Sequence, residues 1–333
     1  MPALSPFLLK PEFHERVWGA DDLSPIYAKP EGMKLVGEAW LTGDRCCIIG
    51  GGELDGMALD EATRKFGAAL VGEAAPQKDR FPLLIKFLFP RDKMSVQVHP
   101  DDEGARRIGQ PCGKTECWYV LASEPGATVG LGLKPGTTRE SMRQAIAEKR
   151  AEHLLNWIEV QPGDLMYVDA GTVHAIGPGL VLVEAQQNSD TTFRLYDYGR
   201  PREIHVEQGL AAMKLDTHAG KVVTQRTNGR HQNLVTSSYF VIDRHLLTVD
   251  HGESLWSFAA NDGPSSVRIL VAIDGCGVVE SDGNADVTFA RGEAVVVPAS
   301  VEEFAVRAQW TVEFLCASLP GKSLPPPKTA FSN

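Results

Sequence analysis

Short apolar runs separated by turn residues dominate the chain. They are rich in β-branched and aromatic residues and are bounded by Gly, Pro, Asp or Asn, as in PLLIKFLF, KMSVQVHP, ECWYVLA, LVLVEAQQ, SVRILVAI and EAVVVPA. Regularly spaced short strands with Gly-containing turns indicate a sandwich or a barrel. The pattern therefore predicts a mainly β fold, without the alternating strands and helices that build a parallel sheet.

Two segments instead repeat their apolar residues with the period of a helix. They are LDEATRKFGAALVG from Leu59 and TTRESMRQAIAEKRAEHLLNWI from Thr137. The second begins with Thr and has an early Glu, as is typical of a helix N-terminus. We expect both as helices inserted between strands.

An internal echo predicts two similar domains. The segment GDLMYVDAGTVH, residues 163–174, aligns with GEAVVVPASVEE, residues 292–303, at a constant offset. Both have a Gly, five residues, a turn and then a strand, which is the second signature of the cupin barrel, a jelly roll of antiparallel strands. The first copy ends on His174 and the second on Glu303, so only the first barrel is expected to hold a metal.

A polar, turn-rich segment, DTHAGKVVTQRTNGRHQN at residues 216–233, predicts a domain boundary near residue 235. A chain of 333 residues is long enough for two domains. We therefore expect a metal-binding catalytic cupin domain with helical insertions over residues 1–235. A degenerate cupin domain without a metal site would follow over residues 236–333, ending in a Pro-rich tail that runs over the surface.

Composition narrows the class of protein. The formal net charge of -10 disfavours general affinity for nucleic acid or anionic membranes, because either requires a basic face. The six cysteines show no paired framework, which favours reduced thiols in a cytoplasmic protein. The first residues lack the pattern of a secretion signal, and no apolar run approaches the roughly 20 residues of a membrane span.

Candidate metal ligands come from strand alternation and from the cupin signature. Ser95, Gln97 and His99 lie two residues apart, so they share one side of a strand. Glu116 begins another predicted strand, and His174 closes the first signature. Two imidazoles, a carboxylate and an amide oxygen suit Zn²⁺, without excluding Mn²⁺, Fe²⁺ or Co²⁺. Either His alone could simply end a strand or pack in a turn, but the joint pattern favours a metal site.

Three charged residues interrupt apolar strands. Lys86 lies inside PLLIKFLF, where it either extends to solvent or points into a polar cavity. Glu184 and Arg194 alternate with apolar neighbours further along the chain. On inward faces they would serve proton transfer and anion stabilisation, and the alternative is a local ion pair.

Four motifs together resemble the type I phosphomannose isomerases, in the short form found in bacteria. They are FPLLIKFLFPRDKMSVQVHPDD, GKTECWYVL, GTVHAIGPGLVLVEAQQNSDTTFRLYDY and an early VWG at residues 17–19, in the order expected of the family. The resemblance runs from about Phe7 to Leu210 and continues weakly into the second barrel. The succession of QxHP, KxE, GxxHA and Ser-Asp-x3-Arg makes it specific.

The resemblance implies a zinc-dependent aldose–ketose isomerase, with one Zn²⁺ per chain, that interconverts mannose 6-phosphate and fructose 6-phosphate. The family's zinc ligands match Gln97, His99, Glu116 and His174, the residues already reached from strand alternation and ligand chemistry. Its active-site arginine matches Arg194, and its lysines match Lys86 and Lys114. One departure is Thr115, which stands where Pro is usual in the family's Lys-Pro-Glu.

The implied reaction moves a proton between C2 and C1 of the open-chain sugar through an enediolate. Glu184 is the first candidate for the base, because a carboxylate in an apolar strand should have a raised pKa, and a metal-bound water or another residue beside the metal is the second. The expected catalytic residues are Arg194, Glu184 and Lys86. The expected substrate-binding residues are Ser95, Lys114 and Asp190, and the substrate is a phosphorylated hexose.

Two other classes of cupin fit parts of the pattern. A non-catalytic sugar-binding or regulatory cupin would not need Arg194 or Lys86 on inward faces, so those residues favour an enzyme. A metal-dependent cupin oxygenase usually has more imidazole ligands and open positions for oxygen, and a colourless zinc protein would weigh against it.

Overall fold

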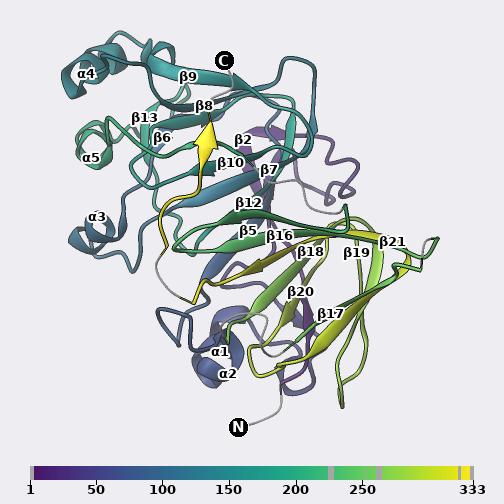
Figure 1. The fold of residues 1–333 in the computed structure, drawn as a ribbon. Coiled ribbons are helices and arrows are strands. Elements are labelled where there is room, and N and C mark those ends of the chain that lie inside the picture. The colour runs from purple at the N-terminus through teal and green to yellow at the C-terminus, as the bar shows by residue number, and fades with distance from the viewer. Residues whose placement is uncertain (1–3, 224–228, 251, 260–264, 322–323, 331–333) are drawn as a thin grey trace.

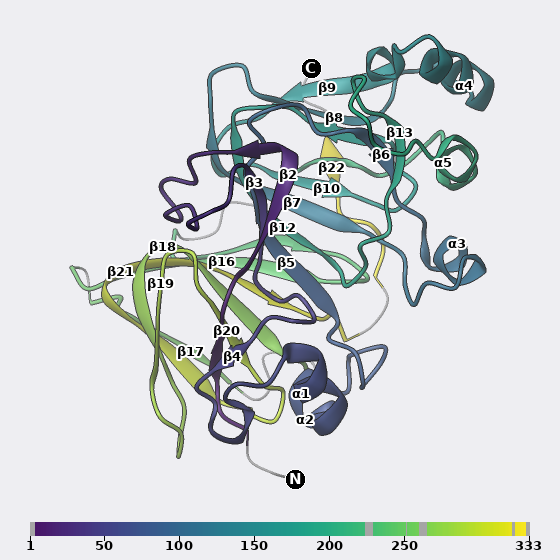
Figure 2. The same ribbon diagram turned by 180° about the vertical axis from the view of Figure 1, so that it is seen from behind.

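The computed structural model describes residues 4–223, 229–250, 252–259, 265–321 and 324–330 (Figure 1). Strands form most of the regular structure of these residues, which confirms the predicted mainly β fold. They pair into three sheets, and the helices lie at their periphery (Figures 1 and 2). Among the described helices, none combines the length and apolar character that crossing a bilayer requires.

The first half of the chain builds two facing sheets. The eight-stranded sheet has the order β2 (Glu12–Ala20), β3 (Val36–Trp40), β5 (Leu83–Leu88), β12 (Leu180–Gln187), β7 (Glu116–Ser123), β10 (Leu165–Val168), β14 (Gly220–Val222) and β22 (Thr329–Ala330). The five-stranded sheet has the order β13 (Phe193–Tyr196), β6 (Val96–Val98), β11 (His174–Ile176), β8 (Thr128–Leu133) and β9 (Leu155–Glu159). An apolar cluster that includes Trp118, Val129 and Leu182 fills part of the space between them.

The third sheet has nine strands and holds most of the C-terminal third of the chain. Its main path is β15 (His231–Thr236), β16 (Val241–Thr248), β21 (Phe304–Ser318), β18 (Arg268–Glu280), β20 (Ala294–Val297), β1 (Phe7–Leu9) and β4 (Ile48–Ile49). Two further strands extend it, β17 (Leu255–Phe258) on β21 and β19 (Val287–Ala290) on β18. The apolar runs quoted from the sequence all contribute to strands, namely β5, β6, β7, β12, β18 and β20.

Strict alternation separates the two faces of the eight-stranded sheet. On β7, Trp118 and Val120 face the five-stranded sheet, whereas Cys117 and Tyr119 face the nine-stranded sheet. The outer face packs in a large apolar cluster with residues of the third sheet such as Val271 and Leu315. Because this sheet is buried on both faces, its strands are apolar on both, and polar residues on the inner face are the exceptions that need an explanation.

Both ends of the chain cross between the two halves. β1 pairs with β20, and β4 pairs with β1, so these two N-terminal strands complete the nine-stranded sheet. In return the Pro-rich tail, predicted to run over the surface, ends in β22, which pairs with β14. Between β14 and β15 the chain passes from the eight-stranded sheet to the nine-stranded sheet, near the predicted boundary at residue 235. The division into two cupin barrels stays a prediction.

The helices are shorter than their patterns indicated. The segment from Leu59 forms α1 (Leu59–Phe66) and α2 (Ala68–Val71), because Gly67 between them has a φ of 47° that ends the first helix. The segment from Thr137 forms α4 (Arg139–Ala147), capped by Thr138 as the sequence indicated. Its last residues, predicted as helix, instead form a 3₁₀ turn (Ala151–Leu154) and then β9, which pairs with β8.

Within the described ranges, three further short helices lie outside the predicted ones. They are α3 (Asp102–Arg107), α5 (Val206–Ala212) and a 3₁₀ turn at Gly52–Leu54. α4 and α5 cover the outer face of the five-stranded sheet, where Met142 and Leu210 join an apolar cluster with Val96 and Val98 of β6. This packing leaves the opposite face of β6 to the polar residues of the site.

Candidate active site and metal centre

A row of polar side chains crosses the inner face of the eight-stranded sheet. In the strand register Lys86 of β5 lies opposite Glu184 of β12, and Glu184 lies opposite Trp118 of β7. Directly opposed residues of antiparallel strands point to the same face. In the adjacent row of this face, Gln186 lies opposite Glu116. All five side chains are buried, so Lys86 and Glu184 point into the space between the sheets.

A second row crosses the facing five-stranded sheet. Arg194 of β13 lies opposite Gln97 of β6, which in turn lies opposite His174 of β11. Ser95 lies on the same side as Gln97, because its hydroxyl donates to Gln97 Oε1 over 3.1 Å. The strand alternation predicted for β6 therefore places its polar residues opposite the row on the other sheet.

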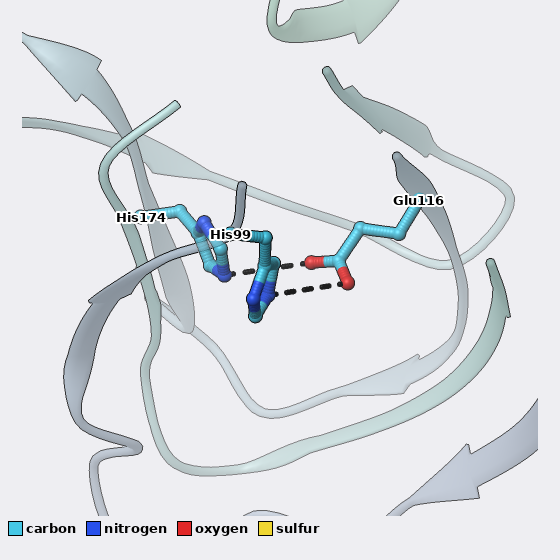
Figure 3. A group of neighbouring side chains, drawn as sticks. All are labelled: His99, Glu116 and His174. Carbon is cyan, nitrogen blue, oxygen red and sulfur yellow. Dashed lines mark ion pairs between the residues drawn. The ribbon is translucent and has the colours of Figure 1, made fainter. Parts of the chain in front are cut away.

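Three side chains from separate strands and their connections converge between these rows. Figure 3 shows His99 and His174 with their Nε2 atoms turned toward the carboxylate of Glu116. His99 Nε2 lies 3.5 Å from Glu116 Oε2, and His174 Nε2 lies 3.4 Å from Glu116 Oε1. One potential ligand atom from each residue falls within 4.8 Å of the others, and all three residues are buried. This convergence suits a metal ion.

Both imidazoles are oriented by backbone carbonyls. His99 Nδ1 lies 2.9 Å from the carbonyl oxygen of Thr191, and His174 Nδ1 lies 3.0 Å from that of Thr172. A carbonyl oxygen only accepts, so each Nδ1 carries the proton and each Nε2 presents a lone pair to the carboxylate. Such second contacts commonly orient histidine ligands in metal sites.

The carboxylate of Glu116 fits a cation as its partner. Among the described residues, Glu116 Oε1 has no hydrogen-bond donor although it is fully buried. A buried carboxylate oxygen without a donor is costly, and a metal ion held jointly with two imidazole nitrogens would satisfy it. The residues present therefore fit a divalent metal with nitrogen and oxygen ligands.

Gln97 is the fourth predicted ligand and lies beside the other three. Its Nε2 approaches His174 Nε2 at 3.2 Å, and its Oε1 accepts from Ser95. An amide nitrogen is not a metal ligand, so binding through Gln97 requires the amide to turn by about half a revolution and present its oxygen. The short distance shows that Gln97 and His174 can reach a common ion.

Lys114 contacts the carboxylate of Glu116, as the two histidines do. Its Nζ lies 2.9 Å from Glu116 Oε2 and 3.3 Å from His99 Nε2. Burial lowers the pKa of Lys114, but the carboxylates of Glu116 and Glu184 raise it by more, so the ammonium stays charged. Burial raises the pKa of Glu116, but the charge of Lys114, followed by the interaction with His99, outweighs it, so that pKa lies well below its usual range.

Lys86 does not extend to solvent. It is 3% exposed, and its Nζ lies 3.2 Å from Glu184 Oε2, 3.8 Å from Glu38 Oε2 and 4.9 Å from the centre of the Trp40 ring. A buried ammonium between two carboxylates and an aromatic face is well compensated. Of the two alternatives for Lys86, the structure therefore favours the polar interior.

Glu184 lies between the two buried lysines. Burial raises its pKa, with the charges of Lys114 and Lys86 acting in the opposite direction, and the net shift is upward as expected for a carboxylate in an apolar strand. Its Oε1 accepts from the indole Nε1 of Trp118 over 3.2 Å. Its ionic partner is Lys86 rather than Arg194, so Glu184 does take part in a local ion pair, although not with Arg194.

The remaining predicted residues lie at the edge of the site. Arg194 is partly buried, and its Nη1 donates to the carbonyl oxygen of Glu203 over 2.8 Å. Arg194 Nε has no hydrogen-bond partner among the described residues. Asp190 is exposed, and its charge contributes to the raised pKa of Lys114 after the larger effects of burial and the two glutamates. Arg194 Nε is buried, so an anion would be received by the exposed end of the guanidinium.

The sequence interpretation missed three residues of the site, namely Glu38, Arg16 and Trp40. Glu38 on β3 is buried and receives hydrogen bonds from Arg16 Nε at 2.8 Å and from Trp40 Nε1 at 2.5 Å. Burial raises the pKa of Glu38, but Lys86 and Arg16 lower it further, to about 2. The signal was present, since a carboxylate interrupts the apolar run VGEAW as Glu184 interrupts LVLVEAQQ.

A cavity of about 770 Å³ lies on the other side of the eight-stranded sheet from the metal cluster. It is lined by Thr115 and Gln187, whose neighbours along the strands, Glu116 and Gln186, point to the inner face. Its far wall includes Tyr239 and the tail around Leu324. The cavity is therefore separated from the cluster by the sheet itself.

Comparisons with known proteins agree with these motifs. Residues 7–121 match the family described as phosphomannose isomerase type I, catalytic domain. Mannose-6-phosphate isomerase ManA of Bacillus subtilis is 31% identical over 318 residues, which cover 90% of this chain and 95% of that protein.

Solved structures share the fold. The mannose 6-phosphate isomerase of Bacillus subtilis superposes with a TM-score of 0.81 at 28% identity, covering 94% of this chain and 99% of that chain. A zinc-bound mannose 6-phosphate isomerase superposes with a TM-score of 0.73 at 18% identity, covering 93% and 99%, and at that identity it supports the fold alone. The motifs, the fold and the extent of these matches establish that the chain belongs to the type I phosphomannose isomerases and is an enzyme of that family.

Proposed function

We propose that the chain interconverts mannose 6-phosphate and fructose 6-phosphate, using one Zn²⁺ per chain. The observation that carries the proposal is the buried cluster of His99, Glu116 and His174, with Lys114 and Lys86 fixed beside it. Two neighbouring carboxylates and two lysines in a closed space suit proton transfer on a sugar that bears negative charge. A non-catalytic cupin would have no need of so many buried charges, which are costly to retain.

The metal would be held by His99 Nε2, His174 Nε2 and Glu116, with Gln97 as the fourth ligand after rotation of its amide. Nitrogen and oxygen donors without sulfur suit zinc in a catalytic role. When bound, Zn²⁺ stabilises negative charge that develops on a substrate oxygen. These residues lie within residues 1–235, which we propose as the catalytic cupin domain, with residues 236–333 as a degenerate cupin domain.

Glu184 is the proposed base. Its carboxylate would take the proton from C2 of the open-chain aldose while the C1 carbonyl accepts the electron pair and an enediolate forms. The proton would then return to C1, and the hydroxyl proton of O2 would move to O1, which leaves the carbonyl at C2 and gives the ketose. The pKa of Glu184 is raised by burial, which makes it a stronger base than an exposed carboxylate. Lys86 at 3.2 Å and Trp118 at 3.2 Å hold the carboxylate in one orientation.

Positive side chains would position the substrate. Arg194 lies at the rim with the end of its guanidinium exposed, and it would bind the phosphate. Lys114 would stabilise charge on the enediolate oxygen, and Ser95 and Asp190 would contact sugar hydroxyls. In this assignment each positive side chain has a separate role in binding the substrate.

A coupled assay tests the function. Purified protein loaded with Zn²⁺ is supplied with mannose 6-phosphate, and fructose 6-phosphate is measured by a coupled reaction. We expect turnover that disappears with a chelator and returns when Zn²⁺ is restored. Absence of turnover in the metal-loaded protein would rule out the proposal, and turnover unaffected by complete metal removal would rule out its zinc dependence.

A further inference from the structure

The segment that carries Lys114 into the site is irregular backbone that three acceptors hold in place. Residues 113–115 precede β7 and belong to no strand or helix. Gly113 N donates to Asp102 Oδ1 at 2.8 Å, Lys114 N to the carbonyl of Pro100 at 3.0 Å, and Thr115 N to Gln187 Oε1 at 2.9 Å. Two of these acceptors are side-chain atoms, so the path of the segment depends on residue identity.

Asp102 is the centre of this arrangement. Its Oδ1 accepts from Gly113 N and, at 3.0 Å, from Gln187 Nε2, while its Oδ2 accepts from the phenol of Tyr239 at 3.3 Å. Gln187 is thereby fixed at both ends, because its Oε1 accepts from Thr115 N. A continuous relay thus runs from Tyr239 through Asp102 and Gln187 to Thr115, the residue between Lys114 and Glu116.

The segment packs tightly against the backbone of Asp101 and Asp102. A Cβ atom on Gly113 would lie 2.6 Å from the backbone carbon of Asp101 and 2.7 Å from the backbone nitrogen of Asp102. Glycine is required where two backbones approach this closely. Loss of the side-chain acceptor would therefore free a segment whose conformation sets where Lys114 and Glu116 point.

The relay joins the two halves of the chain. Tyr239 lies between β15 and β16 of the nine-stranded sheet, whereas Asp102 begins α3. Burial and the neighbouring carboxylate of Asp102 raise the pKa of Tyr239 to about 12, so the phenol keeps its proton and remains a donor. Asp102, Gln187, Thr115 and Tyr239 all line the 770 Å³ cavity, on the face of the sheet away from the metal cluster.

We propose that Asp102 is a positioning residue for the metal centre, through which the C-terminal half of the chain, by way of Tyr239, sets the placement of Lys114 and Glu116. Asp102 itself touches neither metal nor substrate. The kinetic part of this inference rests on the proposed isomerase function, whereas its effect on metal binding does not. Contacts that orient metal ligands from behind are typically worth about 10- to 100-fold in metal affinity or activity.

Asp102→Ala and Asp102→Asn separate position from charge. Alanine removes all three acceptor contacts, whereas asparagine keeps Oδ1 for Gly113 and Gln187 and can donate its amide to Tyr239. We expect Asp102→Ala to weaken Zn²⁺ binding about 10-fold or more, to change the visible spectrum of the Co²⁺-substituted protein, and to lower kcat more than it changes KM. Asp102→Asn should restore all three readouts to near the wild-type values.

A matched pair of tyrosines tests the contribution of the C-terminal half. Tyr239→Phe removes only the phenol that reaches Asp102. Tyr27→Phe removes a comparable phenol, which donates to the carbonyl of Gly292 across the same two halves but takes no part in the relay. We expect a smaller change in the Co²⁺ spectrum and in kcat for Tyr239→Phe than for Asp102→Ala, and none for Tyr27→Phe.

The outcomes are distinguishable. An unchanged Co²⁺ spectrum and Zn²⁺ affinity in Asp102→Ala would overturn the positioning role, and failure of Asp102→Asn to restore them would show that charge matters rather than position. If Asp102→Ala does not fold, the Asp102→Asn and Tyr239→Phe spectra decide the question. Intact metal readouts without any isomerase turnover in the wild type would defeat the proposed function while leaving this test valid.

Discussion

The two turn-and-strand segments, residues 163–174 and 292–303, begin with the same turn and strand but have different surroundings. Each begins with a glycine of positive φ, 91° at Gly163 and 89° at Gly292, and continues into a short strand, β10 or β20. The first then reaches His174 in the metal cluster. The second reaches Glu303, which is exposed, and its strand packs among apolar residues such as Val295 and Phe314.

This difference separates what the fold requires from what the chemistry requires. The C-terminal sheet shows that the architecture is complete with an almost wholly apolar interior. The N-terminal sheets bury lysines, glutamates and histidines in the corresponding space, at a cost that apolar residues would avoid. The buried charges are therefore best explained by function, and the C-terminal sheet provides a comparison, because its described residues include no buried lysine or glutamate.

The largest effect is expected from the equivalent positions that end the two segments. His174→Ala removes a proposed nitrogen ligand and should lower kcat/KM on the order of 10³-fold, because metal stabilisation of a developing charge is worth several kcal/mol. Glu303→Ala at the matching position should leave turnover unchanged. Steady-state kinetics with zinc analysis of the purified proteins checks both, and similar losses in the two variants would contradict the comparison.

Buried and half-buried ion pairs provide the next test. Lys86→Met leaves Glu184 buried without its partner and should lower the free energy of unfolding by about 3 kcal/mol, the low end for a broken buried pair, because Glu184 can take up a proton. Arg244→Met breaks the Arg244–Glu313 pair, whose side chains are 23% and 22% exposed, and should cost at most about 1 kcal/mol. Denaturant unfolding measures both, and equal losses would refute the distinction.

An arginine at the rim should affect turnover without affecting stability. Arg194→Ala removes a donor proposed to bind the phosphate and should lower kcat/KM on the order of 10²-fold, with an unchanged midpoint of unfolding. Arg307→Ala on β21 removes an exposed arginine that pairs with the partly buried Glu280, and it should change neither quantity. Unaltered kinetics in Arg194→Ala would make this arginine structural.

The smallest effect concerns a histidine buried in the C-terminal sheet. Burial, with a smaller contribution from His231, lowers the pKa of His245 from its usual value of 6.5 to about 3. The unfolded chain therefore binds more protons between these values, and stability is lost as the pH falls below 6.5. As the pH falls from 7 to 5, the buried His245 should lower the free energy of unfolding by about 2 kcal/mol.

The variant His245→Leu isolates this contribution. The ring of His245 stacks on that of Phe314 with 4.8 Å between the ring centres, and leucine keeps that space apolar. Unfolding curves at pH 7 and pH 5 should show a smaller difference in the variant than in the wild type. An identical pH dependence in both proteins would mean that His245 keeps an ordinary pKa in the folded state.

Local patterns in the sequence predicted much of the site. Alternation along β6 and β12 placed Gln97, His99 and Glu184 on inward faces, because the side-chain period of a strand is a local property. Glu38 was missed because its meaning depends on β3 pairing with β5, which brings it beside Lys86. Such long-range pairing has no local signature.

The same limit explains the errors in the helices. Residues 155–159 have a helical pattern but form β9, because pairing with β8 outweighs a weak local preference. The glycine that ends α1 could have been read as a stop, since Gly67 directly follows a basic last turn. The relay through Asp102 combines residues from four separate parts of the chain and lay beyond any local reading.

The pairing of β1 with β20 has a consequence for synthesis of the chain. One edge of β1 pairs with the nearby β4, but the other must wait for β20, which is synthesised much later. Contacts between distant residues slow folding, so we expect the nascent protein to expose an unpaired strand edge until β20 has been made. Expression of either half alone would leave that edge permanently open.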